Sequence, residues 1–139
     1  MRRILFLDVD GVLNSRDECG LDGLGDSHLQ QLKRIVDEAG CQIVLTSSWR
    51  LADDLTAMLR RAFKRHGIRI WIDSTPDRSG DRAEEIVAWI DANGPCIGVL
   101  IDDDCYRLEK TGLPCVQTSV DHGLTPELAT EVIRAFDSQ

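Results

Sequence analysis

The sequence lacks the features that mark membrane-spanning, secreted and zinc-stabilised proteins. No apolar run approaches the ~18 residues needed to cross a bilayer. The apolar run at residues 4–7 is too short for the core of a signal peptide. The five cysteines are widely spread and form no C-x-x-C pair, which argues against a structural zinc site or a disulfide framework. We therefore expect a soluble, cytoplasmic protein with no membrane partner.

Three of the cysteines adjoin apolar runs. Cys41, Cys96 and Cys115 each begin or border such a run. Free cysteine packs as a small hydrophobic residue. We expect these three side chains to be buried thiols.

Positive charge is also scarce. Sixteen Lys and Arg residues stand against 24 Asp and Glu residues, which gives a formal net charge of −8. This balance argues against a broad, non-specific grip on nucleic acid or anionic lipid, although a local basic patch remains compatible with it. The chain also has no internal repeat, low-complexity tract or linker. With 139 residues, 42% of them hydrophobic, residues 1–139 are expected to form a single domain.

Short apolar runs alternate with segments of helical periodicity. The predicted strands cover residues 4–7, 41–45, 68–72, 96–101 and 115–118. Helices are predicted between and after them, from N-caps at Ser27, Asp81 and Thr125 and over residues 52–66. This alternation predicts βαβ units. The expected fold is a three-layer, Rossmann-like α/β fold with a mostly parallel five-stranded sheet.

Polar residues follow three of the predicted strands directly. The first strand is followed by Asp8 and Asp10, the second by Thr46 and Ser47, and the fourth by Asp102 and Asp103. In open α/β sheets, ligands bind outside the carboxyl ends of the strands. Arg82, at the start of the helix before the fourth strand, supplies a cation that could reach the same edge. The sequence therefore predicts one site built from these residues.

Clustered carboxylates suggest a metal. Three or more acids within a few ångströms would repel one another unless a hard divalent cation lay among them, and Mg²⁺ is the natural occupant. Such a site binds phosphoryl groups and has a carboxylate in line to attack them. The alternative for Asp8 and Asp10 is a solvated turn at Gly11, and the alternative for Arg82 is a solvated charge.

These motifs together resemble those of the haloacid dehalogenase (HAD) superfamily, in its phosphatase branch. The first motif matches Asp8-Val9-Asp10-Gly11-Val12, the second Thr46, the third Arg82 and the fourth Asp102-Asp103. Together they cover about residues 4–104. The segments LDVDGVLN, VLTSSWR, RAEEIVAWI, LIDDD and HGLTPE more narrowly resemble a small group without a cap domain, associated with RNA-repair polypeptides.

The resemblance implies a role for each matched residue. Asp8 would attack phosphorus and form an aspartyl-phosphate, and Asp10 would protonate the leaving oxygen. Thr46 would donate a hydrogen bond to the phosphoryl group, while Arg82 would neutralise its charge and steady Asp8. The resemblance also implies that Mg²⁺ is held by Asp8, by the backbone carbonyl of Asp10, and by Asp102 with Asp103. Arg82 departs from the Lys that is frequent in the third motif, so its orienting role is less defined.

A second layer of residues follows Thr46. Ser47 and Arg50 are candidate substrate-binding residues, and Trp49 could stack on a base. The alternatives are that Trp49 packs on the following helix and that Arg50 pairs with a nearby acid. Both interpretations stay open from the sequence, whereas Trp71 and Trp89 are expected in the core.

The expected function is a magnesium-dependent phosphomonoester hydrolase. By analogy, its substrate could be the 3′-phosphate end of a nucleic acid, or a small phosphomonoester. The alternative is a weakly active or inactive module that binds magnesium and phosphate within a larger assembly. The sequence predicts no oligomeric state. A receiver domain would need its phosphorylated Asp at the end of a middle strand, a position that residues 44–46 do not offer.

Overall fold

The computed structural model describes residues 1–139 and contains one five-stranded, all-parallel sheet with the strand order β3-β2-β1-β4-β5. The strands are β1 (Arg3–Leu7), β2 (Gln42–Leu45), β3 (Asp73–Ser74), β4 (Ile97–Asp102) and β5 (Cys115–Gln117). The α-helices are α1 (Asp26–Ala39), α2 (Asp53–His66), α3 (Arg82–Asn93) and α4 (Pro126–Asp137), and two short 3₁₀ helices are η1 (Ser48–Leu51) and η2 (Tyr106–Thr111). The predicted α/β class is confirmed.

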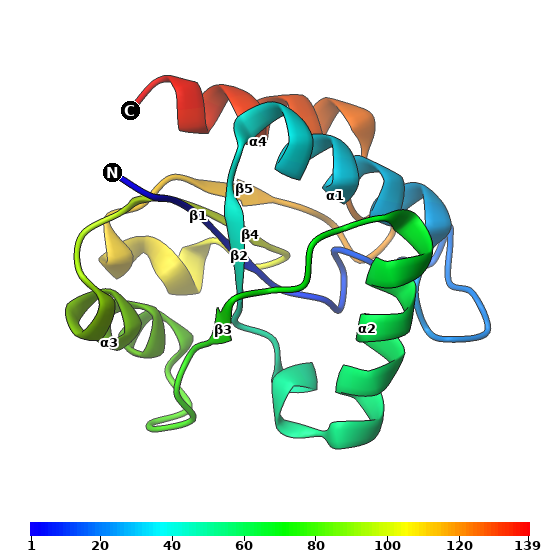
Figure 1. Ribbon diagram of the computed structural model, residues 1–139, viewed down its shortest axis with the longest axis horizontal. Coiled ribbons are helices and arrows are strands. Elements are labelled where there is room, and N and C mark those ends of the chain that lie inside the picture. The colour runs from blue at the N-terminus through cyan, green and yellow to red at the C-terminus, as the bar shows by residue number, and fades with distance from the viewer.

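The sheet lies between two layers of helices (Figure 1). Side chains alternate along β1, so Leu5 and Leu7 join the larger core cluster with α1, α2 and α4. Ile4 and Phe6 point to the other face and pack with residues of α3 and η2. Because β1 is buried on both faces, its sequence is continuously apolar. The three-layer arrangement follows from this pattern.

The helix caps were only partly predicted. Asp81 and Thr125 are N-caps, and their side chains accept hydrogen bonds from the backbone N–H groups of Glu84 and Leu128. Ser27 is not a cap, because α1 already begins at Asp26. The N–H of Ser27 is instead bound by the carboxylate of Glu18 from the preceding loop, at 3.0 Å. The side chain of Glu18, which lies outside the helix, therefore satisfies a free N–H group in the first turn of α1, as an N-cap residue would.

The predicted strand at residues 68–72 is wrong. This segment is irregular, and β3 contains only Asp73 and Ser74, which pair with Val44 and Leu45 of β2. Of the predicted strand, Ile72 donates one backbone hydrogen bond to Ile43. The segment approaches the edge of the sheet without entering its ladder.

The expectation that Cys115 is a buried free thiol is also wrong. Cys105 and Cys115 form a disulfide, with their Cα atoms 5.8 Å apart. Cys105 follows β4 and Cys115 begins β5, ten positions later, so the connection between these two neighbouring strands brings them together. Cys41 is a buried thiol as expected, Cys96 is half-buried, and Cys19 is exposed. The spacing of these two cysteines in the sequence does not indicate the pair, because only the neighbouring positions of β4 and β5 bring them together.

No cap domain interrupts the sheet. The connection between β1 and α1 is a loop of residues 8–25, folded back on itself by turns. The helices are all too short or too polar to pass through a bilayer. The carboxyl ends of the central strands are therefore covered only by loops and by the short helices η1 and η2.

Candidate active site

The register of the sheet places three of the predicted residues in one row. Leu7, the last residue of β1, lies opposite Leu45 of β2 and Ile101 of β4. The next residue of each strand is therefore Asp8, Thr46 or Asp102. The N–H of Asp8 donates to the carbonyl of Ile101 at 3.1 Å, and the N–H of Thr46 donates to the carbonyl of Leu7 at 3.0 Å. The strands carry these side chains to the same edge.

This edge is also where the chain changes sides. The connection after β1 crosses the face covered by α1, whereas β4 leads into η2 on the opposite face. Neighbouring strands whose connections diverge leave a crevice at their carboxyl ends, where α/β proteins bind ligands. Asp8 and Asp102 lie at this switch point.

Arg82 joins the two carboxylates. Its Nη1 atom lies 3.0 Å from Oδ1 of Asp8 and 2.9 Å from Oδ2 of Asp102. The side chains of Asp8 and Asp102 are only 5% and 1% exposed. Loss of Arg82 would cost about 3–5 kcal/mol, because the buried charge of Asp8 would be left without compensation. Arg82 is therefore more than a solvated charge at a helix start.

The carboxyl group of Asp8 is harder to ionise than an ordinary aspartate. Burial raises its pKa from 3.8 to about 6, and the neighbouring Asp102 acts in the same direction. The guanidinium of Arg82 opposes this rise. At neutral pH Asp8 is thus mostly ionised, but at a free-energy penalty that a second cation would relieve.

Asp103 completes an acidic cluster with Asp8 and Asp102. One carboxylate oxygen from each residue lies within 4.8 Å of the others. The pKa of Asp103 is raised, first by burial and then by its hydrogen bond to Asp102. Three hard oxygen donors at this separation suit a small divalent cation such as Mg²⁺. The side chain of Asp10 is not part of this cluster.

Arg107 is a site residue that the sequence analysis missed. Its Nη2 atom lies 3.0 Å from Oδ1 and 3.3 Å from Oδ2 of Asp102. The side chain is 43% exposed and comes from η2. Arg107 lies five residues after Asp102, and no sequence motif marks it as a site residue. The direction of its side chain depends on how η2 turns.

Thr46 has its hydroxyl available. The residue is 2% exposed, and its hydroxyl has no hydrogen-bond partner within the protein. Since no fully buried polar side-chain atom lacks a partner, this hydroxyl must reach the surface of the crevice. It is free to donate to a ligand there.

The predicted substrate contacts of Ser47 and Arg50 are not supported. Ser47 is 1% exposed, and its hydroxyl accepts a hydrogen bond from the N–H of Trp49 as the cap of η1. Arg50 uses all five of its N–H groups within the protein. They donate to the carbonyls of Thr46, Ser47, Thr75 and Pro76 and to the carboxylate of Glu85. Arg50 joins η1 to the loop before α3 and has no donor left for a substrate.

Trp49 packs in the core and does not offer its ring for stacking. The side chain belongs to the larger core cluster, and the residue is 6% exposed. Its indole Nε1 donates to Oδ1 of Asp10 at 3.0 Å. Asp10 itself is exposed at the start of the turn after β1. Trp71 and Trp89 are buried, as predicted.

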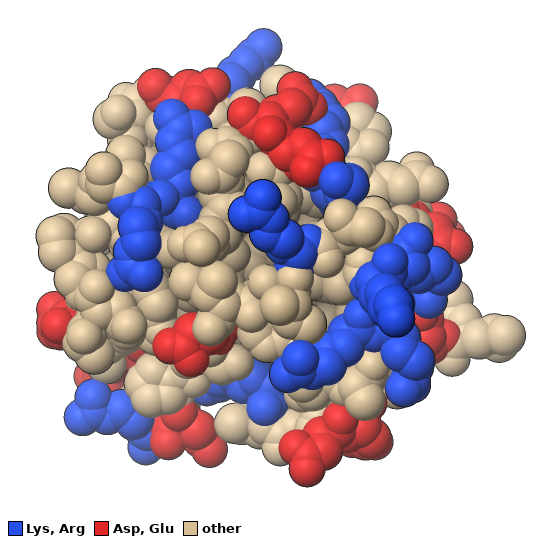
Figure 2. Space-filling view, viewed as in Figure 1, with Lys and Arg blue, Asp and Glu red and all other residues tan.

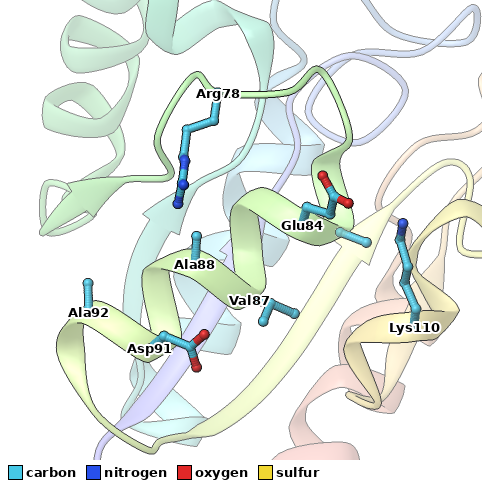
Figure 3. Close-up of a pocket in the computed structure, with 8 residues that line it drawn as sticks. Arg78, Glu84, Val87, Ala88, Asp91, Ala92 and Lys110 are labelled. Atoms are coloured by element: carbon cyan, nitrogen blue, oxygen red, sulfur yellow. The ribbon is translucent and has the colours of Figure 1, made fainter.

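Two surface hollows lie near this edge. One, of about 580 Å³, is lined almost entirely by polar and charged residues, among them the cations Arg50, Arg82, Arg107 and Lys110 and the acids Asp77, Asp81 and Glu85. Figure 3 shows the other, of about 500 Å³, between Arg78 and Lys110 along the outer face of α3, where Val87 and Ala88 lie. Only the first hollow is lined by Arg82, which contacts Asp8 and Asp102, so this hollow is the one next to the candidate chemistry.

Comparisons with known proteins agree with this architecture. Residues 4–129 match the family model described as the HAD domain in Swiss Army Knife RNA repair proteins. A similar solved structure is described as "Structure of Pnkp1/Rnl/Hen1 complex", with a TM-score of 0.55 and 18% sequence identity. The alignment covers 88% of this chain and 46% of that chain, so the likeness spans about half of the larger protein. No protein with a curated description matches the sequence.

Proposed function

This chain belongs to the family of HAD domains in Swiss Army Knife RNA repair proteins, and from that premise we propose that it is a phosphatase that uses Asp8 as its nucleophile. The observation that carries the proposal is the bridge formed by Arg82 between the buried carboxylates of Asp8 and Asp102. Two acids and one cation at a strand-end crevice form a site for a phosphoryl group and a divalent metal.

The metal ligands follow from the acidic cluster. Asp8, Asp102 and Asp103 would hold Mg²⁺, together with the backbone carbonyl of Asp10. When bound, Mg²⁺ supplies positive charge that offsets the repulsion among these acids and the negative charge of the phosphoryl oxygens. The bound Mg²⁺ would therefore offset part of the free-energy penalty of burying the ionised carboxylate of Asp8.

The first chemical step joins Asp8 to phosphorus. Oδ1 of Asp8 is held by Arg82, which leaves the other carboxylate oxygen to attack. A bond forms between this oxygen and phosphorus while the bond from phosphorus to the ester oxygen breaks. The leaving oxygen takes a proton from Asp10 and departs as an alcohol. Thr46 and Arg82 donate hydrogen bonds to the phosphoryl oxygens and hold them in place.

The second step regenerates the enzyme. A water molecule attacks phosphorus and gives its proton to Asp10, and the bond from phosphorus to Asp8 breaks. Inorganic phosphate leaves, Asp8 returns as a carboxylate, and Asp10 is again protonated. No group outside Asp8, Asp10, water and the substrate changes its bonds in the cycle.

The proposed substrates are phosphate monoesters, with the 3′-phosphate end of a nucleic acid as the first candidate. The hollow beside Arg82 leaves room for more than a phosphate, and Arg107 and Lys110 line it. Lys and Arg side chains also gather on the right of Figure 2, over α2 as Figure 1 places it. These local groups of cations are compatible with a nucleic-acid substrate despite the net charge of −8, although Asp77, Asp81 and Glu85 also line the hollow.

A substrate panel tests the proposal. Purified protein with Mg²⁺ is assayed on small phosphomonoesters and on oligonucleotides that carry a 3′-phosphate, with Asp8→Asn in parallel. We expect wild type to release phosphate and the variant to lose at least about 10³-fold, since each ~1.4 kcal/mol of lost transition-state stabilisation is tenfold in rate. Acid-quenched reactions on a radiolabelled phosphate ester should show label on wild-type protein and none on Asp8→Asn.

Two outcomes would count against the proposal. Activity that survives Asp8→Asn would remove Asp8 from its role as nucleophile. No activity on any ester would favour the alternative, a module that binds magnesium and phosphate within a larger assembly.

A further inference from the structure

Asp10 presents its two carboxylate oxygens to different surroundings. Oδ1 accepts a hydrogen bond from Nε1 of Trp49 at 3.0 Å and another from Nδ2 of Asn14 at 3.0 Å. Oδ2 accepts no hydrogen bond from the protein, and the residue is exposed. The two oxygens are therefore not equivalent, although a free carboxylate is symmetric.

The amide of Asn14 is held in one orientation. Its Oδ1 accepts from the N–H of Gly11 at 2.9 Å, and its Nδ2 donates both to Asp10 and to the carbonyl of Gly23, the latter at 2.9 Å. A rotated amide would place an oxygen against two acceptors and an N–H₂ against a donor. The network therefore determines which Asn14 atom faces Asp10.

The indole of Trp49 is equally constrained. The backbone N–H of Trp49 donates to Oγ of Ser47 at 3.1 Å, and its carbonyl accepts from Oγ1 of Thr56 at 3.0 Å. The far edge of the Trp49 ring lies next to Gly23. A Cβ atom added at Gly23 would lie 3.6 Å from Cη2 of Trp49, which is ordinary van der Waals contact. The indole ring is held by packing beside Gly23 at its far edge and by the hydrogen bond from Nε1 to Asp10. These two contacts keep the N–H directed at Asp10.

We propose that Trp49 and Asn14 are positioning residues that reserve Oδ2 of Asp10 for proton transfer. By occupying Oδ1, they leave Oδ2 as the oxygen that carries the proton and faces the leaving group. In the first step, the proton moves from Oδ2 to the ester oxygen as the bond from that oxygen to phosphorus breaks. In the second step, the attacking water returns a proton to Oδ2. This inference rests on the proposed phosphatase function.

The test compares two esters whose leaving groups differ in their need for a proton. 4-Nitrophenolate is stable without one, whereas the alkoxide of glycerol 2-phosphate must be protonated as it leaves. Trp49→Phe keeps an aromatic ring and removes only the N–H. We expect kcat/KM for glycerol 2-phosphate to fall about tenfold or more, a part of the 10²–10⁴-fold that a general acid contributes. The value for 4-nitrophenyl phosphate should change by less than about twofold.

The chain offers a matched control in Trp89. This buried indole also donates to a carboxylate, from Nε1 to Oδ2 of Asp73 at 2.7 Å, and packs against the other face of the sheet. Trp89→Phe should leave the ratio of the two kcat/KM values unchanged. Asn14→Ala provides a second variant, which should lower the same ratio in the same direction as Trp49→Phe.

A double variant separates positioning from general loss of structure. In an Asp10→Asn background, Trp49→Phe should cause no further change in the ratio, because the group that it positions is gone. An equal fall for both esters in Trp49→Phe, or no fall for either, would overturn the inference. Absence of activity in wild type on both esters would overturn the proposed function itself, so the two failures are distinguishable.

Discussion

Burial raises the pKa of Asp8, whereas the positive charge of Arg82 lowers it. Its pKa is raised to about 6 in the folded protein, whereas an exposed aspartate titrates near 3.8. Well above pH 6 the carboxyl group is ionised in both the folded and the unfolded state, and the folded state carries the full penalty, about 3 kcal/mol from the difference in pKa. Between pH 6 and 4 the folded state takes up a proton first, so the penalty shrinks as pH falls.

Asp8→Asn should therefore stabilise the metal-free protein while removing activity. We expect its free energy of unfolding to exceed that of wild type by about 1–2 kcal/mol at pH 7.5. The gain is less than the full penalty because the amide remains a buried polar group, and its N–H₂ cannot accept the hydrogen bond that a carboxylate oxygen accepts from Arg82. Urea unfolding with EDTA at pH 7.5 and pH 4.5 measures the difference. The gain should be smaller at the lower pH, and a gain that grows as pH falls would contradict the assignment.

Arg107 contacts the same oxygens that a metal would need. Its guanidinium lies 3.0 Å from Asp102, and a cation at this distance repels a divalent ion bound to that carboxylate. Arg107→Gln should therefore bind Mn²⁺ or Mg²⁺ more tightly, by about three- to tenfold, as expected for loss of a partly exposed charge pair. Calorimetric titration gives the affinity without reference to activity. Arg107→Lys, which keeps the charge, is the control and should stay closer to wild type.

Short side chains at strand ends were predictable, and long side chains were not. Asp8 and Asp102 lie where the sequence placed them, because one bond separates the carboxyl group from Cβ and the strand fixes Cβ. The guanidinium of Arg50 reaches five acceptors, three of which come from residues 75, 76 and 85. The sequence around Arg50 does not predict these three hydrogen-bond partners, because they lie 25 or more residues away along the chain.

At the scale of elements, the turn after β1 controls the geometry of the cluster. Gly11 has φ +78°, and a Cβ added there would lie 2.8 Å from Oδ2 of Asp103. Both the backbone conformation and the close approach of Asp103 therefore require glycine. The turn sets the distance between the first and fourth motifs.

Gly11→Ala should damage both stability and the acidic cluster. We expect a loss of about 1–3 kcal/mol in the free energy of unfolding, from left-handed strain and displacement of Asp103. Metal affinity should fall as well, because Asp103 must move. Gly40→Ala is a suitable control, since Gly40 also has a positive φ but nothing lies within 4 Å of an added Cβ. It should cost stability alone, and an equal loss of metal affinity in both variants would contradict the proposed contact.

Elements inside the sheet were predictable, and its edge was not. β1 and β4 are continuous apolar runs because both of their faces are covered. Residues 68–72 are also mostly apolar, but Arg69 interrupts them and Ile70 and Ile72 are exposed. The ladder with β2 contains only Asp73 and Ser74, opposite Val44 and Leu45. The Cys105–Cys115 disulfide was also not predictable from local sequence, because the two residues meet only when β4 pairs with β5.

At the scale of the whole molecule, the acidic cluster should couple metal binding to stability. The three carboxylates of Asp8, Asp102 and Asp103 come together only in the folded chain, so a metal that they bind stabilises that state. At a Mg²⁺ concentration ten times the dissociation constant, the gain is about 1.4 kcal/mol. This gain should raise the melting temperature by about 4 °C.

Thermal unfolding with EDTA and then with Mg²⁺ measures this coupling. Asp102→Asn should lose most of the rise, and NaCl at equal ionic strength should not reproduce it. A rise of the same size in Asp102→Asn would place the metal elsewhere. Asp104→Asn is a matched control, because Asp104 is exposed and lies outside the cluster.

The sequence by itself determined the α/β class, the order of the central elements and the chemical identity of the strand-end residues. It could do so because strand periodicity, helix periodicity and a carboxylate's short reach are local properties. The tertiary structure alone decided what Arg50, Trp49 and Arg107 do, which cysteines pair and how short β3 is. These features depend on contacts between segments distant in the chain, and the direction of a long side chain is set by whichever partners the fold brings to it.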